Sequence, residues 1–196
     1  GSVVGLVSTG SAALMVENGL GFVPTVLICL GIGAVYGLFN GFVVTRMKIQ
    51  AFVVTLASMN IARGLARLWS GGAGIPLTYG IGEGLAAPEF EILSTRLGGV
   101  VPVPAIIFLV LLAIFWVVMS KTRFGRQIYA TGGNATAAHL SGIKTKRVKL
   151  IAFMLSGLLA SVAGMIHSAQ ISQGGPNEGM SYEMYAVAAV AIGGTS

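Results

Sequence analysis

Charged residues are scarce in this sequence. Only 9% of its 196 residues are charged and 55% are hydrophobic, whereas a soluble domain carries about 25% charged residues. A water-soluble surface cannot be built from this composition, so we predict a membrane protein. The net charge of +6 would suggest a nucleic-acid ligand in a soluble chain. Here the basic residues flank apolar stretches without interleaved aromatic residues, which indicates membrane topology and no nucleic-acid partner.

Residues that enzymes use for chemistry are also missing. The sequence has no Asp, and its one cysteine, Cys29, lies inside an apolar run. It therefore has no cysteine pair for a metal or an intrachain disulfide. Neither H-E-x-x-H nor G-x-S-x-G occurs, and residues 141–145 lack the spacing of a phosphate-binding P-loop. We expect no catalytic residue, no metal site and no cofactor on this chain.

What the sequence does have is long apolar runs. A membrane-spanning helix needs about 20 mostly apolar residues. Four such spans are predicted, at 22–45, 50–69, 102–120 and 150–170, and partial spans at 1–16 and 183–196 complete about six crossings. The predicted fold class is an all-α polytopic transmembrane bundle forming one domain over 1–196. Both ends resemble cuts through spans, so we expect a partial domain.

Loop charges predict the orientation, because positively charged loops stay in the cytosol. Seven basic residues and no acidic one lie in residues 121–149: Lys121, Arg123, Arg126, Lys144, Lys146, Arg147 and Lys149. This segment is predicted to be a large cytoplasmic loop, and the short loop with Arg46 and Lys48 lies on the same side. The loops that carry Glu83, Glu89 and Glu91, and then Glu178, are predicted to lie outside.

Small residues recur along two of the spans. They are Gly33, Gly37 and Gly41 in the first, and Ala152, Ser156, Ala160, Gly164 and Ser168 in the second. Close backbone approach along such series holds membrane helices together. We predict helix-packing roles for Gly33, Gly37, Gly41, Ser156, Ala160 and Gly164. A helix dimer face between subunits is the alternative.

The cytoplasmic loop contains the signals of a short helix. Asn134 is a good N-cap after the breaker at 131–133, and Gly142 is a natural residue to follow the helix end. The helix over 135–141 has an apolar side formed by Ala137, Ala138, Leu140 and Ile143. It is suited to inserting into a groove on a partner, and an interfacial helix lying on lipid is the alternative.

Polar residues in the outer half of the bundle are candidates for a substrate pathway. Arg63 and Arg67 lie one turn apart, and an arginine in a membrane must snorkel outward, pair or face a water-filled space. Met59 and Asn60 lie one turn before Arg63. Residues 173–179 cannot be helical and form either part of the external mouth, with Gln173, or a plain connection. His167 is expected to be packed and hydrogen-bonded, not a proton relay.

The run GGNATAAHLSGIKTKRVK (132–149) resembles the coupling segment of ABC sugar importer permeases of the ribose, galactose and xylose type. Four further blocks are similar to that family in its own order: VVGLVSTGSA (3–12), FNGFVVTRMKIQAFVVTLASMNIARGLARLWSGG (39–72), SKTRFGRQIYATGGN (120–134) and SYEMYAVAAVAIGGTS (181–196). The resemblance covers nearly the whole chain except 73–100.

The resemblance implies a bacterial inner-membrane permease that moves a monosaccharide by alternating access and is not itself an enzyme. ATP and Mg²⁺ would bind to a separate cytoplasmic ATPase, an external sugar-binding protein would deliver cargo, and a second permease subunit, expected to be an identical copy, would complete the path. The ATPase would contact Gly133, Asn134, Ala137, Ala138, His139, Leu140, Ser141, Gly142 and Ile143. Ala135, Thr136 and His139 stand where the family often has charged residues, which favours apolar docking over ion pairing.

Other functions stay open at this point. An importer for a branched-chain amino acid or a signalling furanone has the same architecture. An integral-membrane enzyme is disfavoured by the missing Asp and catalytic pairs, and a passive channel would lack the ATPase. No residue distinguishes a pentose from a hexose.

Overall fold

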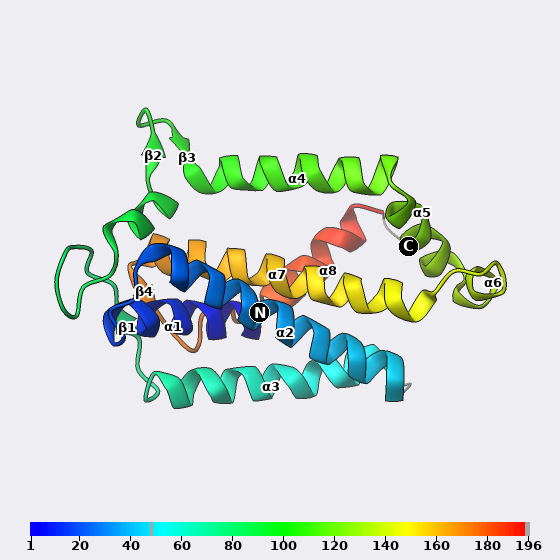
Figure 1. Cartoon of the computed structure of the whole chain (residues 1–196), viewed down its shortest axis with the longest axis horizontal. Coiled ribbons are helices and arrows are strands. Elements are labelled where there is room, and N and C mark those ends of the chain that lie inside the picture. The colour runs from blue at the N-terminus through cyan, green and yellow to red at the C-terminus, as the bar shows by residue number, and fades with distance from the viewer. Residues whose placement is uncertain (48, 195–196) are drawn as a thin grey trace.

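The computed structural model describes residues 1–47 and 49–194 and is built mainly from helices (Figure 1). Within these residues, four helices are long and apolar enough to cross a membrane: α2 (Phe22–Met47), α3 (Ala51–Trp69), α4 (Val103–Lys121) and α7 (Thr145–Ile171). They confirm the four predicted spans and the all-α membrane fold class. Lys48, Thr195 and Ser196, which the sequence-based topology includes, lie outside the described residues.

The two predicted partial spans form shorter apolar helices. They are α1 (Ser2–Val16), with 15 residues, and α8 (Tyr182–Ile192), with 11. Neither reaches the roughly 20 residues that a straight crossing requires. Of the six predicted crossings, the described residues therefore contain four of full length and two shorter helices.

Helix α1 lies at the centre of the bundle. Thirteen of its fifteen residues are buried, and it packs against α2, α3 and α7. A helix that is apolar and small-sided all round can be enclosed in this way. Trp69 at the end of α3 packs on Gly10, where a Cβ would lie 3.1 Å from the indole ring.

The closest helix pair is α2 with α7, and the glycines of α2 form its contact. A Cβ added at Gly37 would lie 2.9 Å from the Cα of Met154, and one at Gly41 would lie 3.1 Å from the Cα of Leu150. At Gly33 the neighbour is Gly157 of α7, whose own carbonyl carbon would lie 3.0 Å from such a Cβ. The two backbones therefore touch along one face of α2.

One end of the bundle carries a folded cap, residues 70–102, which we call the outer cap after the predicted orientation. It contains β1 (Ile75–Pro76), the 3-10 helix η1 (Pro88–Leu93), β2 (Arg96–Leu97) and β3 (Val101–Pro102). The cap has its own buried residues: Phe90 is fully enclosed, and its ring meets Phe22 edge-on with centroids 6.2 Å apart. Strand β1 pairs antiparallel with β4 (Gln173–Gly174), which directly follows α7.

The opposite end, which we call the cytosolic end after the predicted orientation, carries α5 (Arg123–Gly133) and α6 (Ala135–Leu140). The expected break at 131–133 was wrong, because α5 continues through Gly132 and Gly133. Asn134 ends α5 and starts α6, so a single residue separates the two helices. The structure confirms the short helix after Asn134.

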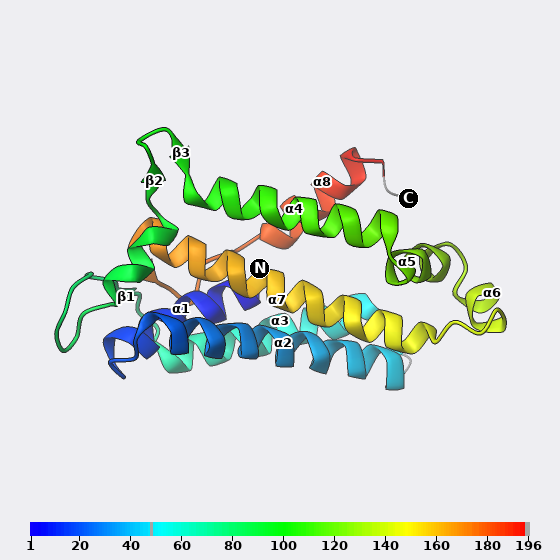
Figure 2. The same cartoon turned by 45° about the horizontal axis from the view of Figure 1, so that its top comes forward.

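Helix α4 stands apart from the other spans (Figure 2). None of its residues is buried, and its main contacts are with η1, β3 and α5 at its two ends. It therefore presents apolar side chains around most of its circumference.

Candidate functional site

The candidate site has three parts along the bundle: the outer cap, a cavity between the helices, and α6 at the cytosolic end. The cap is attached to the outer end of α7 by hydrogen bonds as well as by the β1–β4 pair. The Leu77 amide donates to the Ser172 carbonyl over 2.9 Å, and the Tyr79 hydroxyl donates to the Ala169 carbonyl over 3.3 Å. Burial raises the pKa of Tyr79, so the hydroxyl keeps the proton that this bond needs.

Between the cap and the cavity the chain makes a non-helical connection, residues 172–181, which we call the descending segment. It lies along α1 in the opposite direction. Gly174 packs on Ala12 and Ser8, the Gly175 amide donates to the Ser8 hydroxyl over 3.4 Å, and a Cβ at Gly179 would lie 2.8 Å from that of Val4. From Ala12 back to Gly1 this path is roughly 16 Å of helix, about half of a membrane's apolar thickness.

The descending segment explains where α8 begins. Because the segment runs the length of α1, α8 starts near the middle of the bundle, beside the chain's first residue, and not at the outer end (Figure 1). Non-helical backbone at membrane depth is tolerated only where protein or a water-filled space covers it. Gly174, Gly175, Pro176 and Gly179 are all buried, so protein supplies the cover here.

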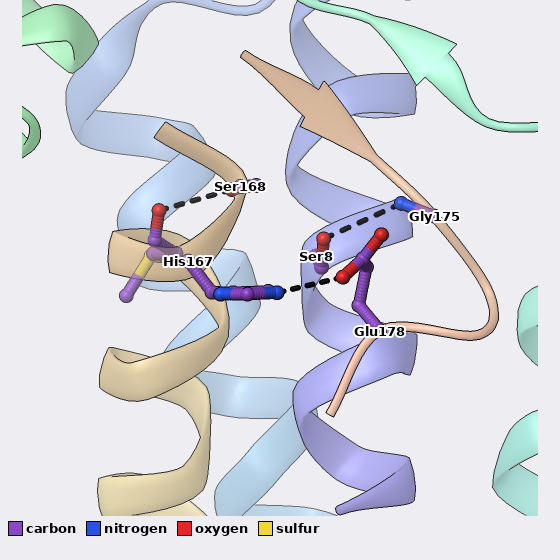
Figure 3. Close-up of polar contacts among 6 residues, drawn as sticks. Ser8, His167, Ser168, Gly175 and Glu178 are labelled. Atoms are coloured by element: carbon purple, nitrogen blue, oxygen red, sulfur yellow. Dashed lines mark hydrogen bonds and ion pairs between the residues drawn. The ribbon is translucent and has the colours of Figure 1, made fainter. Parts of the chain in front are cut away.

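A close polar contact joins this segment to α7. His167 Nε2 lies 2.6 Å from Glu178 Oε2, and both side chains are about three-quarters buried. Figure 3 shows the imidazole of His167 pointing from α7 to the Glu178 carboxylate, and it shows the Ser8 hydroxyl of α1 next to the Gly175 amide. The packed and hydrogen-bonded role predicted for His167 fits this geometry.

A cavity of about 820 Å³, which we call the central cavity, lies between the start of α1 and helices α2, α3, α7 and α8. Most of its wall is apolar. Its polar lining residues are Ser2, Tyr36, Asn40, Thr55, Ser58, Ser156 and Glu183. The Tyr36 hydroxyl donates to the Ser58 carbonyl, whereas Asn40 Oδ1 is buried and has no hydrogen-bond partner among the described residues.

The four predicted pathway residues lie in different places. Met59 lines the central cavity. Asn60 is exposed beside it and its amide donates to the Leu56 carbonyl of its own helix over 3.2 Å. Arg63 is half-buried one turn farther out, and its enclosed Nε has no hydrogen-bond partner in the described part of the chain. Gln173 is in β4 at the outer cap. The structure does not bring these four side chains together.

The predicted packing residues also separate into groups. Gly33, Gly37 and Gly41 contact α7 at Leu150, Phe153, Gly157 and Ser161. Ser156 and Ala160, for which a helix-packing role was also predicted, line the central cavity. Gly164 packs on α1, where a Cβ would lie 2.8 Å from the Val4 carbonyl oxygen. The face of α7 that meets α2 therefore runs through Gly157 and Ser161, one residue along from Ser156 and Ala160.

At the cytosolic end, α6 has well-formed termini. The Asn134 side chain accepts hydrogen bonds from the amides of Thr136 and Ala137, both over 3.0 Å, and Gly142 has a φ of +84° just past the helix end. Such caps satisfy amides that a six-residue helix would otherwise leave unpaired.

The side chains of α6 do not form one exposed apolar face. Ala138 is only 5% exposed, whereas Leu140 is 83% exposed at the end of the helix. Ala137, His139 and Ser141 are exposed, Gly133 is exposed at the end of α5, and Ile143 is half-buried. Leu140 is thus the prominent apolar contact available to a partner, while Ala138 packs within the chain itself.

Sequence reasoning missed three features of the site. The outer cap has no spanning helix, and from residue 73 on it lies outside the blocks that carry the resemblance. The descending segment has the composition of a surface connection, which does not reveal that it enters the bundle. The polar part of the central cavity's wall could have been predicted from the sequence, because Tyr36 and Asn40 lie four residues apart on one face of an apolar span.

Among the described residues no group of His, Cys, Asp and Glu could hold a metal ion.

Comparison with known proteins gives consistent relatives. A family model described as "Branched-chain amino acid transport system / permease component" matches residues 1–196. The ribose import permease protein RbsC of Haemophilus influenzae is 38% identical and that of Bacillus subtilis 40% identical, each over 100% of this chain and 59% of the relative. The autoinducer 2 import system permease protein LsrC of Yersinia pseudotuberculosis is 35% identical over 100% of this chain and 53% of the relative.

The chain spans about 60% of the length of the ribose permeases it matches. No solved structure matches it significantly.

Proposed function

Because the chain belongs to the family of branched-chain amino acid transport system permease components, we propose that it is the membrane-spanning subunit of an ATP-driven importer and that its cargo is a monosaccharide. The family, its bacterial members and the four apolar helices confirm the predicted setting, a multi-pass protein of a bacterial inner membrane. The observation that carries the proposed cargo is the full-chain similarity to two proteins named ribose import permeases.

The two ends of the bundle support different partners. Leu140 on the capped helix α6 is an exposed apolar side chain in a segment rich in basic residues. It is suited to insert into a groove on a cytoplasmic ATPase, which would hold ATP and Mg²⁺. The outer cap, with Glu83, Glu89 and Glu91 exposed, is the proposed contact for a sugar-binding protein. The unburied helix α4 leaves room for lipid and for a second permease subunit, which we propose to be an identical copy.

In this proposal the chain makes and breaks no covalent bond. Nucleotide binding on the partner ATPase would shift the population between outward-open and inward-open states of the permease. The motion would reach the membrane helices through α6 and the start of α7, because α6 is bracketed by α5 and α7 with only short connections. The central cavity is the proposed space through which the sugar passes.

A second candidate is import of a signalling solute. It is favoured by the 35% identity to a protein named an autoinducer 2 permease. The partners and the mechanism would be the same, and only the cargo would differ.

The test is transport by the complete permease chain in proteoliposomes with its ATPase and binding protein. We expect uptake of radiolabelled ribose or another monosaccharide only when both ATP and the binding protein are present. Uptake that is independent of ATP would indicate a passive channel and contradict the proposal. ATP-dependent uptake of autoinducer 2 or leucine with no uptake of any sugar would establish an importer with the other cargo and overturn the monosaccharide assignment.

A further inference from the structure

We propose that His167 and Glu178 form a latch that holds the descending segment against α1 and so positions α8 at the rim of the central cavity. His167 and Glu178 are positioning residues in this proposal, and neither is required to touch the transported solute. The consequence for transport rests on the proposed function, whereas the latch itself is a property of the fold.

The descending segment has little regular structure to hold it in place. Within it, the Glu178 amide donates to the Gly175 carbonyl over 3.2 Å, and at its end the Tyr182 amide donates to the Gly179 carbonyl over the same distance. Ser172 and Ser181, its first and last residues, both have a left-handed backbone, with φ of 50° and 64°. This conformation is unfavourable for residues other than glycine and persists only where the surroundings impose it. The segment is thus bracketed by two strained residues and depends on external contacts.

The β1–β4 pair and the Leu77–Ser172 hydrogen bond hold the start of the segment, and side chains of three helices supply the contacts farther along. Ser8 of α1 accepts from the Gly175 amide over 3.4 Å, Arg67 of α3 donates to Asn177 Oδ1 over 3.2 Å, and His167 of α7 meets Glu178 at 2.6 Å. The first is long and the second lies between exposed side chains. The His167–Glu178 contact is the shortest of the three and is mostly enclosed, and a hydrogen bond to a carboxylate is stronger than one between neutral groups.

The same contact reaches α8. The His167 ring meets the ring of Tyr182, the first residue of α8, edge-on at a centroid distance of 5.7 Å. The next residues, Glu183 and Met184, line the central cavity, as do Val187 and Ala188 one turn later. Because His167 holds Glu178 and contacts Tyr182, it sets the position of α8 in the wall of the central cavity.

Hydrogen exchange measured by mass spectrometry tests the latch without any transport assay. In the complete permease chain, His167→Ala and Glu178→Ala should each speed exchange in the peptide that covers residues 172–181 by about tenfold, the effect of losing one charge-assisted hydrogen bond. The double variant should exchange no faster than either single variant, because both remove the same interaction. The exchanged pair His167→Glu with Glu178→His should return the rate toward that of the wild type.

The matched control is His139→Ala, since His139 is the other histidine of the chain and lies on α6. It should leave exchange in the 172–181 peptide unchanged, and peptides from α2 should exchange alike in all variants. If His167→Ala unfolds the whole chain, Glu178→Gln keeps the side-chain shape and removes the charge, so faster exchange limited to 172–181 is again expected. Wild-type exchange in Glu178→Gln and Glu178→Ala, or additive effects in the double variant, would overturn the latch.

The latch and the proposed function fail in different ways. If 172–181 exchanges at the wild-type rate in every variant while the wild-type complex imports sugar, the latch is wrong and the function stands. If exchange responds as expected but the wild-type complex imports no sugar, the latch stands and the cargo assignment fails. If both hold, sugar uptake in His167→Ala should fall at least about fivefold and recover in the exchanged pair, an outcome that simple loss of a side chain does not give.

Discussion

At the scale of single residues, glycines allow the backbones of α2 and α7 to touch, because glycine has only a hydrogen atom in place of a side chain. Apolar side chains gain little by leaving lipid for protein, so the contact depends on dispersion between closely packed backbones. Gly33 faces Gly157, and a Cβ on either would lie 3.0 Å from the carbonyl carbon of the other. The same helix offers a contrast in Gly31, which is exposed and where an added Cβ would meet no neighbouring heavy atom within 4 Å.

Replacing Gly33 by leucine should therefore destabilise the bundle, while Gly31→Leu should not. Overpacking costs about 1–3 kcal/mol, and more where the neighbour is backbone that cannot rotate away. Thermal unfolding of the purified protein in one detergent checks this. A melting temperature for Gly33→Leu equal to that of Gly31→Leu would remove the α2–α7 contact from the account.

The glycines of α2 could be predicted from sequence, but their partner face could not. Helix α7 carries two small-residue series side by side, one through Ser156 and Ala160 and the other through Gly157 and Ser161. Both have helical spacing, so periodicity alone does not decide which faces a neighbour. Packing against α2 selects Gly157 and Ser161 for close contact and leaves Ser156 and Ala160 at the central cavity.

At the scale of elements, the two ends of α6 are the helix ends that could be predicted best from the sequence. Its N-cap at Asn134 and the positive φ at Gly142 are local properties, and local rules predict them well. Its exposed face depends on how it packs against α5 and α7, which is a tertiary property. Ala138 is consequently buried in the chain, so a charge placed there would test folding and not the contact with a partner.

Leu140 is the better position for that test. Leu140→Glu should place an unpaired charge in the proposed ATPase groove and lower ATP-dependent uptake by at least about tenfold, with normal insertion in the membrane. Thr136→Glu is the matched control. It adds the same charge in the first turn of α6, where the helix dipole favours it, and should retain most of the uptake. Equal uptake by Leu140→Glu and the wild type would mean that α6 does not dock through its apolar end.

Two elements could not be predicted by searching for spans. The outer cap folds around Phe90 and Phe22, which are far apart in sequence, and its strands have only two residues each. The descending segment has a loop's composition, with three glycines and a proline in residues 173–179. Only its contacts with α1 show that it enters the bundle.

At the scale of the whole molecule, the two ends of the bundle are chemically different. The exposed glutamates of the outer cap gather at one end, and the seven basic residues of 121–149 gather at the other, around α5 and α6 (Figure 1). The proposed import needs this polarity, because cargo would arrive on one side and the ATPase would act on the other. The four spans, their order and this charge asymmetry were all predictable, since apolar length and loop charge are properties of sequence alone.

The orientation of the bundle is the premise on which the ATPase contact, the cap contact and the direction of transport all depend. Single cysteines at Lys146 and at Glu83, in a Cys29→Ser background, measure it directly with a membrane-impermeant maleimide, because both positions are exposed. We expect the cysteine at 83 to react in intact spheroplasts and the cysteine at 146 to react only after the membrane is permeabilised. Reaction at 146 from outside, with 83 protected, would place α6 beyond the reach of a cytoplasmic ATPase and contradict the account.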